Sequence, residues 1–490
     1  MARSSCFYMS INLLFLYLWS HPIGAHNLSR SVKPLCLENE ISALLQFKER
    51  YDIANVSRGP LTRPKILSWN KGRDCCSWDG IECDENTGHV IILNLRSSFL
   101  YGSIDSNSTL FQLAHLEKLD LSDNHFNYSQ IPSRIGDLLR LTYLNVSYSV
   151  FSGRVPSEIF KLTRLVYLDL CCNLDPYTST RLLEMQPLGL RSLAQNLTSL
   201  EVLSLGVVAM SAKVPNTLAN LSSLRALQMD VCDLHGVFPS AIFNLPKLIY
   251  LGVADNKALI GQLPYFNSSS PLKQLRVPGT SFSGKLPASI GSIPASFANL
   301  SNLEYLSVSM SPFTAQTISY LSWIWKIKKL ASLYLQKINL YGEIPPSIGN
   351  LSQLVELSFL GNQLSGEILG AIGDLKGLQG LNLSNNLLTG QIPPLLGNLK
   401  ALESLDLSLN KLSGQIPQKL TELGFLSVLN MSYNNLTGSV PRGKQFDTFS
   451  NNSFEGNSGL CGEFISTKCQ DSRISRTTFN PPRRRPGIGN

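Results

Sequence analysis

One repeated pattern, LxxLxLxxNxLxGxIPxxLxxL, constrains the fold of this 490-residue chain more than any other feature. Its best copies are residues 378–401 and 402–425, and most copies begin 24 residues after the previous one. A degenerate first copy begins at His89. Full copies begin at Leu116, Leu141, Leu165, Leu200, Leu224, Leu248, Leu272, Leu303, Leu330, Leu354, Leu378, Leu402 and Leu426. A fixed period of this length predicts a solenoid, because one unit cannot bury its leucines without neighbouring units.

Each position of the pattern has a physical role. The alternation in LxLxx sends leucines to one side, as in a strand, and successive units place these strands side by side in a parallel sheet. The following asparagine is expected to turn inward and satisfy backbone groups at the bend. These asparagines are Asn124, Asn173, Asn256, Asn362, Asn386, Asn410 and Asn434. Cys232 takes the same place in its own repeat, which predicts a buried, free thiol.

The N-terminus is typical of a secretory signal peptide, which we assign to residues 1–25. Arg3 precedes an apolar run that ends near Trp19, and small residues follow at Gly24 and Ala25. A buried N-terminal helix is the alternative, and the run is shorter than the roughly 20 residues of a membrane span. Secretion favours disulfides among the cysteines that flank the array. These are Cys36, Cys75, Cys76 and Cys83 before it, and Cys461 and Cys469 after it. Zinc binding by Cys75, Cys76 and Cys83 is the alternative.

Several motifs resemble one known class of proteins. The segment GxIPxxLGNLxxLxxLDLSxN, with EISALLQFK at residues 40–48 and CCSWDGIEC at residues 75–83, is similar to the plant leucine-rich-repeat class. That class includes receptor kinases, receptor-like proteins and secreted inhibitors of wall-degrading enzymes. Residues 441–449 and 457–462 resemble the C-terminal cap of disease-resistance receptor-like proteins of the Cf type. The resemblance implies disulfides Cys36–Cys75 and Cys76–Cys83.

The predicted fold is therefore an α/β, plant-type leucine-rich-repeat solenoid. It is a curved right-handed superhelix with a parallel β-sheet on its concave face and disulfide-stapled end caps. The expected organisation is an N-terminal cap at 26–88, an array of about 13–14 repeats at 89–449, a C-terminal cap at 450–469 and a disordered basic tail at 470–490.

Two features depart from this family pattern. The family's receptor-like members continue into a transmembrane helix, whereas residues 470–490 are polar and rich in arginine, which suggests a relative truncated or spliced before its anchor. Repeats 165–199, 272–302 and 303–329 are longer than the others, as if loops were extruded from the solenoid. Residues 175–195 are alternatively a decayed repeat.

Catalytic motifs are lacking, so binding rather than catalysis is expected, without a cofactor or metal. The chain has no GxSxG, HExxH, phosphate-loop or kinase motif, and its six histidines are scattered in sequence. The net charge of +8 includes five arginines against one aspartate in residues 470–490. The remainder has no clustered basic face of the kind that nucleic acid requires.

Candidate ligand contacts lie at outward positions of the concave strands, where Tyr and Arg are typical of binding hot spots. They are Tyr143, Tyr148, Tyr167, Gln228, Asp230, Tyr250, Arg276, Tyr305 and Tyr334. Ordinary cross-strand pairing is the alternative explanation for these side chains. Candidate glycosylation sites are Asn55, Asn107, Asn127, Asn145, Asn196, Asn220, Asn267, Asn299, Asn350, Asn382, Asn430, Asn435 and Asn451. Asn-Leu-Ser/Thr is also embedded in the repeat itself, so some of these motifs serve structure alone.

The resemblance implies a receptor-like recognition protein in plant defence, on the extracellular face of the plasma membrane. It would sense a pathogen-derived or endogenous peptide or protein and signal through a partner receptor kinase. A soluble apoplastic inhibitor of a microbial wall-degrading enzyme is the main alternative, favoured by the lack of a transmembrane segment in this sequence. A developmental receptor-like protein is another alternative.

Overall fold

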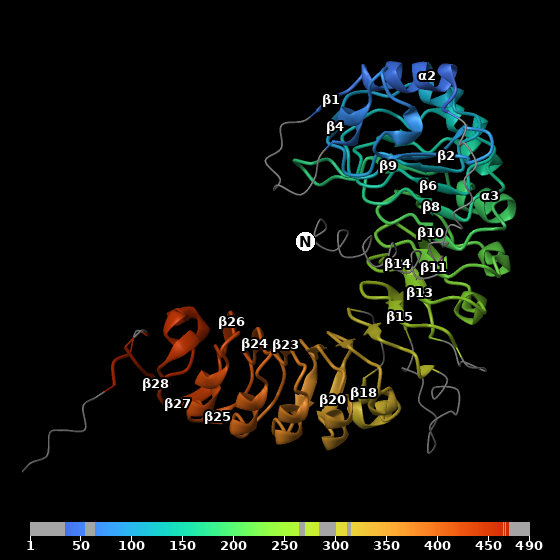
Figure 1. Cartoon of the computed structure of the whole chain (residues 1–490). Coiled ribbons are helices and arrows are strands. Elements are labelled where there is room, and N and C mark those ends of the chain that lie inside the picture. Colours follow the sequence, from blue (N-terminus) through green and yellow to red (C-terminus); the bar gives the residue numbers. More distant parts are fainter. Residues whose placement is uncertain are drawn as a thin grey trace, which may run out of the picture.

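The computed structural model describes residues 35–53, 64–263, 270–283, 300–310, 315–463, 465 and 467–469. The signal peptide at 1–25 and the basic tail at 470–490 lie outside these ranges. The described chain forms a curved array with one long sheet along its inner, concave side (Figure 1). This arrangement confirms the predicted solenoid.

The main sheet has fifteen strands, and its order follows the sequence. All neighbouring strands are parallel except β2 and β3, which form an antiparallel pair at the N-terminal end. The strands are β2 (Ile81–Cys83), β3 (Val90–Asn94), β5 (Lys118–Asp120), β6 (Tyr143–Asn145), β8 (Tyr167–Asp169), β10 (Val202–Ser204), β11 (Ala226–Gln228), β13 (Tyr250–Gly252), β15 (Gln274–Arg276), β17 (Tyr305–Ser307), β19 (Ser332–Tyr334), β21 (Glu356–Ser358), β23 (Gly380–Asn382), β24 (Ser404–Asp406) and β26 (Val428–Asn430).

Short sheets run along the flank of the array. They contain β1 (Asp52–Ile53) with β4 (Leu100–Tyr101), β7 (Gly153–Arg154) with β9 (Leu183–Glu184), β12 (His235–Val237) with β14 (Ala258–Gly261) and β16 (Ser281–Phe282), β18 (Gln316–Thr317) with β20 (Leu340–Glu343) and β22 (Gln363–Ser365), and β25 (Ser413–Gly414) with β27 (Asn435–Ser439) and β28 (Gly459–Cys461). Most of these strands follow the bend after a main-sheet strand, whereas β1 precedes the main sheet in sequence. The glycine of LxGxIP has a left-handed backbone conformation in this turn, for example at Gly414 (φ 77°).

Helices cover the outer side. The α-helices are α2 (Glu38–Lys48) and α3 (Gly189–Asn196). The 3₁₀ helices are η1 (Lys65–Ser68), η2 (Cys75–Ser77), η3 (Thr109–Gln112), η4 (Ser133–Asp137), η5 (Ser157–Lys161), η6 (Asn216–Asn220), η7 (Ser240–Asn244), η9 (Ile318–Leu321), η10 (Ile324–Lys326), η11 (Pro346–Asn350), η12 (Gly370–Asp374), η13 (Pro394–Asn398), η14 (Gln418–Glu422), η15 (Lys444–Thr448) and η16 (Asn451–Ser453). Most begin just after a proline, whose fixed φ suits the first turn of a helix.

The seven asparagines of the pattern turn inward, as predicted. In one copy, Nδ2 of Asn386 donates to the carbonyl oxygens of Phe359 and Leu383, each at 3.0 Å. Its Oδ1 accepts the backbone N–H of Leu364 at 3.1 Å. Cys232 takes this place in its own repeat, where its Sγ lies 3.1 Å from the carbonyl oxygen of Leu205. Cys232 is buried and free, as expected.

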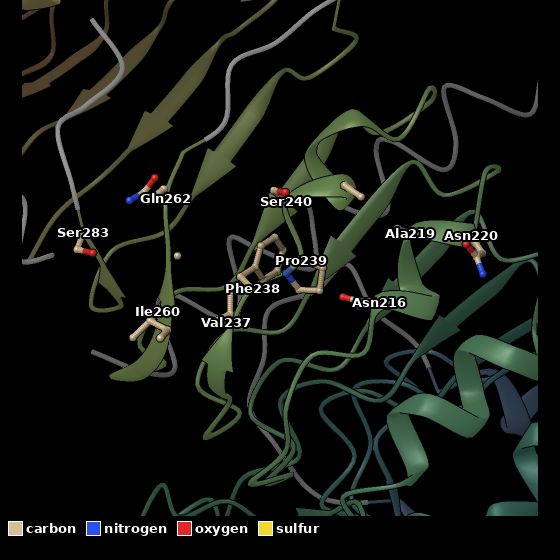
Figure 2. Close-up of a pocket in the computed structure, with 12 residues that line it drawn as sticks. Asn216, Ala219, Asn220, Val237, Phe238, Pro239, Ser240, Ile260, Gln262 and Ser283 are labelled. Atoms are coloured by element: carbon tan, nitrogen blue, oxygen red, sulfur yellow. The ribbon is translucent and has the colours of Figure 1, made fainter.

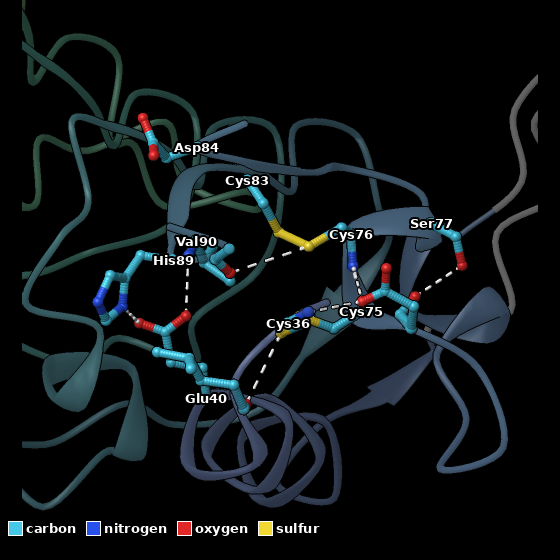
Figure 3. The surroundings of a disulfide bond; sticks show 12 residues. Cys36, Glu40, Cys75, Cys76, Ser77, Cys83, Asp84, His89 and Val90 are labelled. Atoms are coloured by element: carbon cyan, nitrogen blue, oxygen red, sulfur yellow. Dashed lines mark hydrogen bonds and ion pairs between the residues drawn. A yellow bond between two sulfur atoms is a disulfide. The ribbon is translucent and has the colours of Figure 1, made fainter. Parts of the chain in front are cut away.

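Disulfides hold both ends of the array. Cys36 is joined to Cys75 and Cys76 to Cys83, which is the pairing that the resemblance implies (Figure 3). Cys461 is joined to Cys469 at the C-terminal cap. Zinc binding by Cys75, Cys76 and Cys83 is therefore excluded in this oxidised form. A further disulfide joins the adjacent residues Cys171 and Cys172, which the repeat pattern does not predict.

The three long repeats do not add strands to the main sheet. In the longest, β8 pairs directly with β10, so residues 175–195 do not form a separate repeat. Within them β9 pairs with β7 on the flank, and α3 lies between η5 and η6 on the outer side, where it buries Leu190 and Leu193. The extra residues of this repeat therefore lie mainly before β9. In the other two long repeats, β15 pairs with β17 and β17 with β19. Across the part of the chain that the structure describes, no helix is long and apolar enough to cross a membrane.

Candidate binding surface

The sheet places the candidate ligand contacts in rows along the concave face. Tyr143 pairs with Tyr167, and further along Gln274 pairs with both Tyr250 and Tyr305. Because these pairs are in register, their side chains leave the sheet on the same side. Arg276 and Tyr334 lie in the adjacent row, where both pair with Ser307.

These side chains are less exposed than their outward positions suggested. Five are buried, namely Tyr143, Tyr167, Gln228, Asp230 and Tyr250. The rings of Tyr143 and Tyr167 stack with centroids 4.3 Å apart, which contributes to this burial. Tyr148 lies after β6 and is partly buried, as are Arg276, Tyr305 and Tyr334. The expectation of nine open side chains is therefore wrong for the five buried ones.

Gln228 and Asp230 form hydrogen bonds with groups on neighbouring strands and bends of the same sheet. Ser204 Oγ donates to Gln228 Oε1 at 3.0 Å, and Gln228 Nε2 donates to Asp230 Oδ2 at 3.4 Å. Asp230 Oδ1 also accepts the backbone N–H of Ala254. These contacts satisfy polar groups within the sheet, which favours a structural role for both residues.

The partly exposed candidates form one group, which we call the Arg276 cluster: Arg276, Tyr305 and Tyr334. The guanidinium carbon of Arg276 lies 5.6 Å from the ring centroid of Tyr305, a cation–π arrangement. The ring of Tyr305 also lies next to the ring of Tyr334, with the two centroids 5.6 Å apart. The cluster therefore combines a positive charge, two rings and two hydroxyl groups on neighbouring strands.

Buried groups around Arg276 determine its electrostatics. Burial raises the pKa of Asp230, and the nearby charge of Arg276 acts in the opposite direction. Burial lowers the pKa of Arg276. The nearby Tyr250 and Asp230 raise it, and the pKa ends above its ordinary value. Burial also raises the pKa of Tyr305. At neutral pH the cluster therefore presents a cation and neutral phenols, which suits a ligand with a carboxylate or an aromatic group.

The glycosylation candidates differ in exposure. Exposed asparagines are Asn107, Asn127, Asn196, Asn220, Asn350 and Asn435, and partly buried ones are Asn382, Asn430 and Asn451. Asn145 is buried, and its Nδ2 donates to the hydroxyl of Tyr143 at 3.4 Å. Asn55, Asn267 and Asn299 lie outside the described residues. The exposed asparagines remain the better candidates for glycans.

A cluster that sequence reasoning missed lies where the N-terminal cap meets the array. Nδ1 of His89 is 3.0 Å from Oε1 of Glu40 (Figure 3), and the ring of His89 stacks on that of His115 with centroids 3.5 Å apart. The two histidines had been described as scattered. Aligning the degenerate first repeat with the second would have found them, because Ile92 pairs with Lys118 and each histidine lies three residues earlier.

A hollow on the flank of the array is a further concave feature. It lies beside β12 and β14, where Val237 and Ile260 expose apolar side chains (Figure 2). Asn220, a glycosylation candidate, is part of its lining. The hollow adjoins residues outside the described ranges, so no function is assigned to it.

Comparison with protein families identifies the class. The leucine-rich repeat region model matches residues 89–340, which is half of the chain. The leucine rich repeat N-terminal domain model matches residues 37–84, and a leucine rich repeat model matches residues 377–399 and 401–423. The chain belongs to the leucine-rich-repeat family.

Curated relatives are plant receptor-like proteins, which confirms the resemblance seen in the sequence. Receptor-like protein Cf-9 of Solanum pimpinellifolium is 34% identical over 355 residues, which cover 70% of this chain and 33% of the relative. Receptor-like protein 7 of Arabidopsis thaliana is 41% identical over 260 residues, which cover 53% of this chain and 26% of the relative. The chain thus spans about a third or less of the length of these relatives.

Solved structures confirm the fold. A plant peptide hormone receptor, RGFR1 in complex with RGF2, superposes with a TM-score of 0.52 at 23% identity, covering 80% of this chain and 72% of that one. A TDR receptor superposes with a TM-score of 0.54 at 24% identity, covering 74% and 68%. Both share the repeat architecture of this chain.

Proposed function

We propose that this chain is a ligand-binding portion of an extracellular receptor-like protein that senses a peptide or protein in plant defence. The observation that carries the proposal is the match to Receptor-like protein Cf-9 over 70% of the chain. The disulfides at both ends agree with an oxidising, extracellular setting. Lacking kinase motifs, the chain would signal through a partner receptor kinase.

The Arg276 cluster is the proposed contact surface for the ligand. Its side chains are partly exposed and broad, and each can offer both apolar area and a polar end. Further toward the C-terminus, the strands carry smaller groups such as Ser404 and Asp406, which offer less contact area. One solved relative in fold is a peptide hormone receptor in complex with RGF2, which supports a peptide as the class of ligand.

Fractionation of the tagged protein expressed in leaves tests the receptor role. We expect it in membrane complexes from which a receptor kinase co-precipitates. Recovery wholly in apoplastic fluid, with tight binding to a microbial polygalacturonase, would instead establish the inhibitor function. Purified polygalacturonase is the probe for that alternative.

Substitution of the cluster tests the contact surface. Culture filtrate of a plant pathogen serves as the probe, and components that the purified chain retains are measured by mass spectrometry. Tyr334→Ala is expected to weaken retention of the specific component by about thirtyfold, since a hot-spot side chain contributes about 2 kcal/mol. Ser404→Ala, a small change on the same face, is the matched control. Equal retention by both variants would place the contact surface elsewhere.

A further inference from the structure

Three side chains of types that commonly bind metals lie close together between the N-terminal cap and the first repeats, although they are far apart in sequence. Glu40 lies on α2, His89 directly precedes β3, and His115 lies three residues before β5. Because β3 pairs with β5, the two histidines have equivalent positions, each three residues before a paired residue of the two strands. Helix α2 packs beside this end of the sheet and supplies the carboxylate (Figure 3).

The spacing of the donor atoms suits a single ion. One carboxylate oxygen of Glu40 and one ring nitrogen from each histidine all lie within 4.8 Å of one another. Around a tetrahedral zinc ion with bonds of about 2.0–2.2 Å, ligand atoms are about 3.3 Å apart. The Oε1–Nδ1 distance between Glu40 and His89 is already 3.0 Å. The two imidazoles are stacked with their planes 18° apart, so binding of one ion by both requires the rings to turn out of this stack and direct a nitrogen each at the metal.

The surrounding backbone holds these donors in place. The second carboxylate oxygen of Glu40, Oε2, accepts the backbone N–H of Val90 at 2.8 Å. The backbone N–H of Asp84 donates to the carbonyl oxygen of His89 at 2.8 Å, which closes the turn before β3. The Cys36–Cys75 and Cys76–Cys83 disulfides fix the segments that carry Glu40 and His89. Such outer contacts orient metal ligands and raise affinity.

Charge and access also favour a cation. The Glu40 side chain is only 4% exposed, and its one ion-pair partner among the described residues is His89. A buried carboxylate needs a compensating positive charge, and the His89 side chain is 27% exposed, so an ion and its water could enter. Asp84 adds attraction for a cation near His115, while the exposed guanidinium of Arg140 opposes it.

We propose that Glu40, His89 and His115 bind one zinc-class divalent ion, which ties the N-terminal cap to the first two repeats. Two imidazoles and a carboxylate are donors that Zn²⁺ accepts, and water would complete its coordination. The alternative is that Glu40 and His89 form an ordinary hydrogen-bonded pair and that His115 only stacks on it.

Zinc chloride titrated into the chelator-stripped, secreted full-length chain tests the site by calorimetry. We expect one equivalent to bind and the melting temperature to rise with zinc concentration. His115→Gln and His89→Gln are each expected to weaken binding at least about tenfold, since even outer contacts of a metal contribute that much. His235→Gln, a partly buried histidine in another repeat, is the control and should bind as the wild type does.

Cobalt provides a readout that a merely structural role would not affect. Co²⁺ added to the stripped protein should give the intense visible bands of a low-symmetry, four-coordinate site, and His115→Gln should lose them while melting normally without metal. Absence of saturable binding would overturn the proposal. So would binding that is unchanged in either His115→Gln or His89→Gln.

Discussion

At the scale of single residues, the inward asparagines are the side chains on which neighbouring turns depend most. Replacing Asn386 with alanine removes one donor group and one acceptor group, so the buried carbonyl of Leu383 and the backbone N–H of Leu364 lose this partner. An unsatisfied buried group costs about 1–3 kcal/mol, so we expect a loss of about 2 kcal/mol or more. Urea unfolding monitored by circular dichroism measures it. Gln379→Ala, on an exposed side chain, should change stability little, and equal losses in the two variants would contradict the assigned role.

Cys232 occupies an asparagine position with a thiol. Its complete burial raises the pKa of the thiol, so the reactive thiolate is disfavoured at neutral pH. We expect no reaction with Ellman's reagent in the folded protein and labelling of Cys232 after denaturation. Mass spectrometry of the labelled peptides identifies the site. Rapid labelling of Cys232 under native conditions would show that this repeat opens or that the thiol is accessible.

The sequence predicted these two roles because a periodic pattern determines the direction in which each side chain leaves the backbone. The same pattern does not determine how closely side chains on a shared face cover one another. Tyr167 and Tyr250 were therefore expected to be open, whereas the structure buries both. Arg276 and Tyr334 were expected on the concave face and do lie there, partly exposed.

At the scale of elements, the two N-terminal disulfides close loops of very different length. Cys36 and Cys75 are 39 residues apart, while Cys76 and Cys83 are 7 apart. Loop-closure entropy gives contributions of about 4 kcal/mol for the first and about 2.5 kcal/mol for the second. Paired serine substitutions at each disulfide should therefore destabilise the cap by different amounts, the longer loop more. Thermal unfolding of the two variants gives the comparison, and a larger loss from the short loop would contradict this entropic explanation.

The elements also show where prediction from sequence ends. The strand, the bend and the flanking turn of each regular repeat follow from residues with fixed roles, such as Leu405, Asn410 and Gly414. Residues 175–195 were ambiguous because their leucines suit either a helix or another repeat. Only the direct pairing of β8 with β10 decides between these, since strand pairing depends on residues far apart in sequence. In the Glu40–His89–His115 cluster, repeat alignment could have paired the two histidines, but the place of Glu40 depends on how α2 packs against the array.

At the scale of the whole molecule, each repeat contacts its neighbours and little else. The main sheet is paired strictly in sequence order, from β2 to β26. In such an array, stability is approximately a sum of terms for repeats and for the interfaces between neighbours, and unfolding need not be all-or-none. A destabilising substitution in one repeat should therefore lower the local stability of the neighbouring repeats more than that of distant ones.

Hydrogen exchange measured by mass spectrometry tests this locality with two matched substitutions in the leucine core. Leu405 and Leu119 have equivalent positions on β24 and β5, and both are fully buried. Each change to alanine should cost about 2–5 kcal/mol. Leu405→Ala is expected to speed exchange mainly in the C-terminal repeats and to leave the disulfide-held cap protected, while Leu119→Ala should do the reverse. Uniform loss of protection along the chain in both variants would instead show that the array unfolds as one cooperative unit, so that a defect near one end would also disturb the Arg276 cluster.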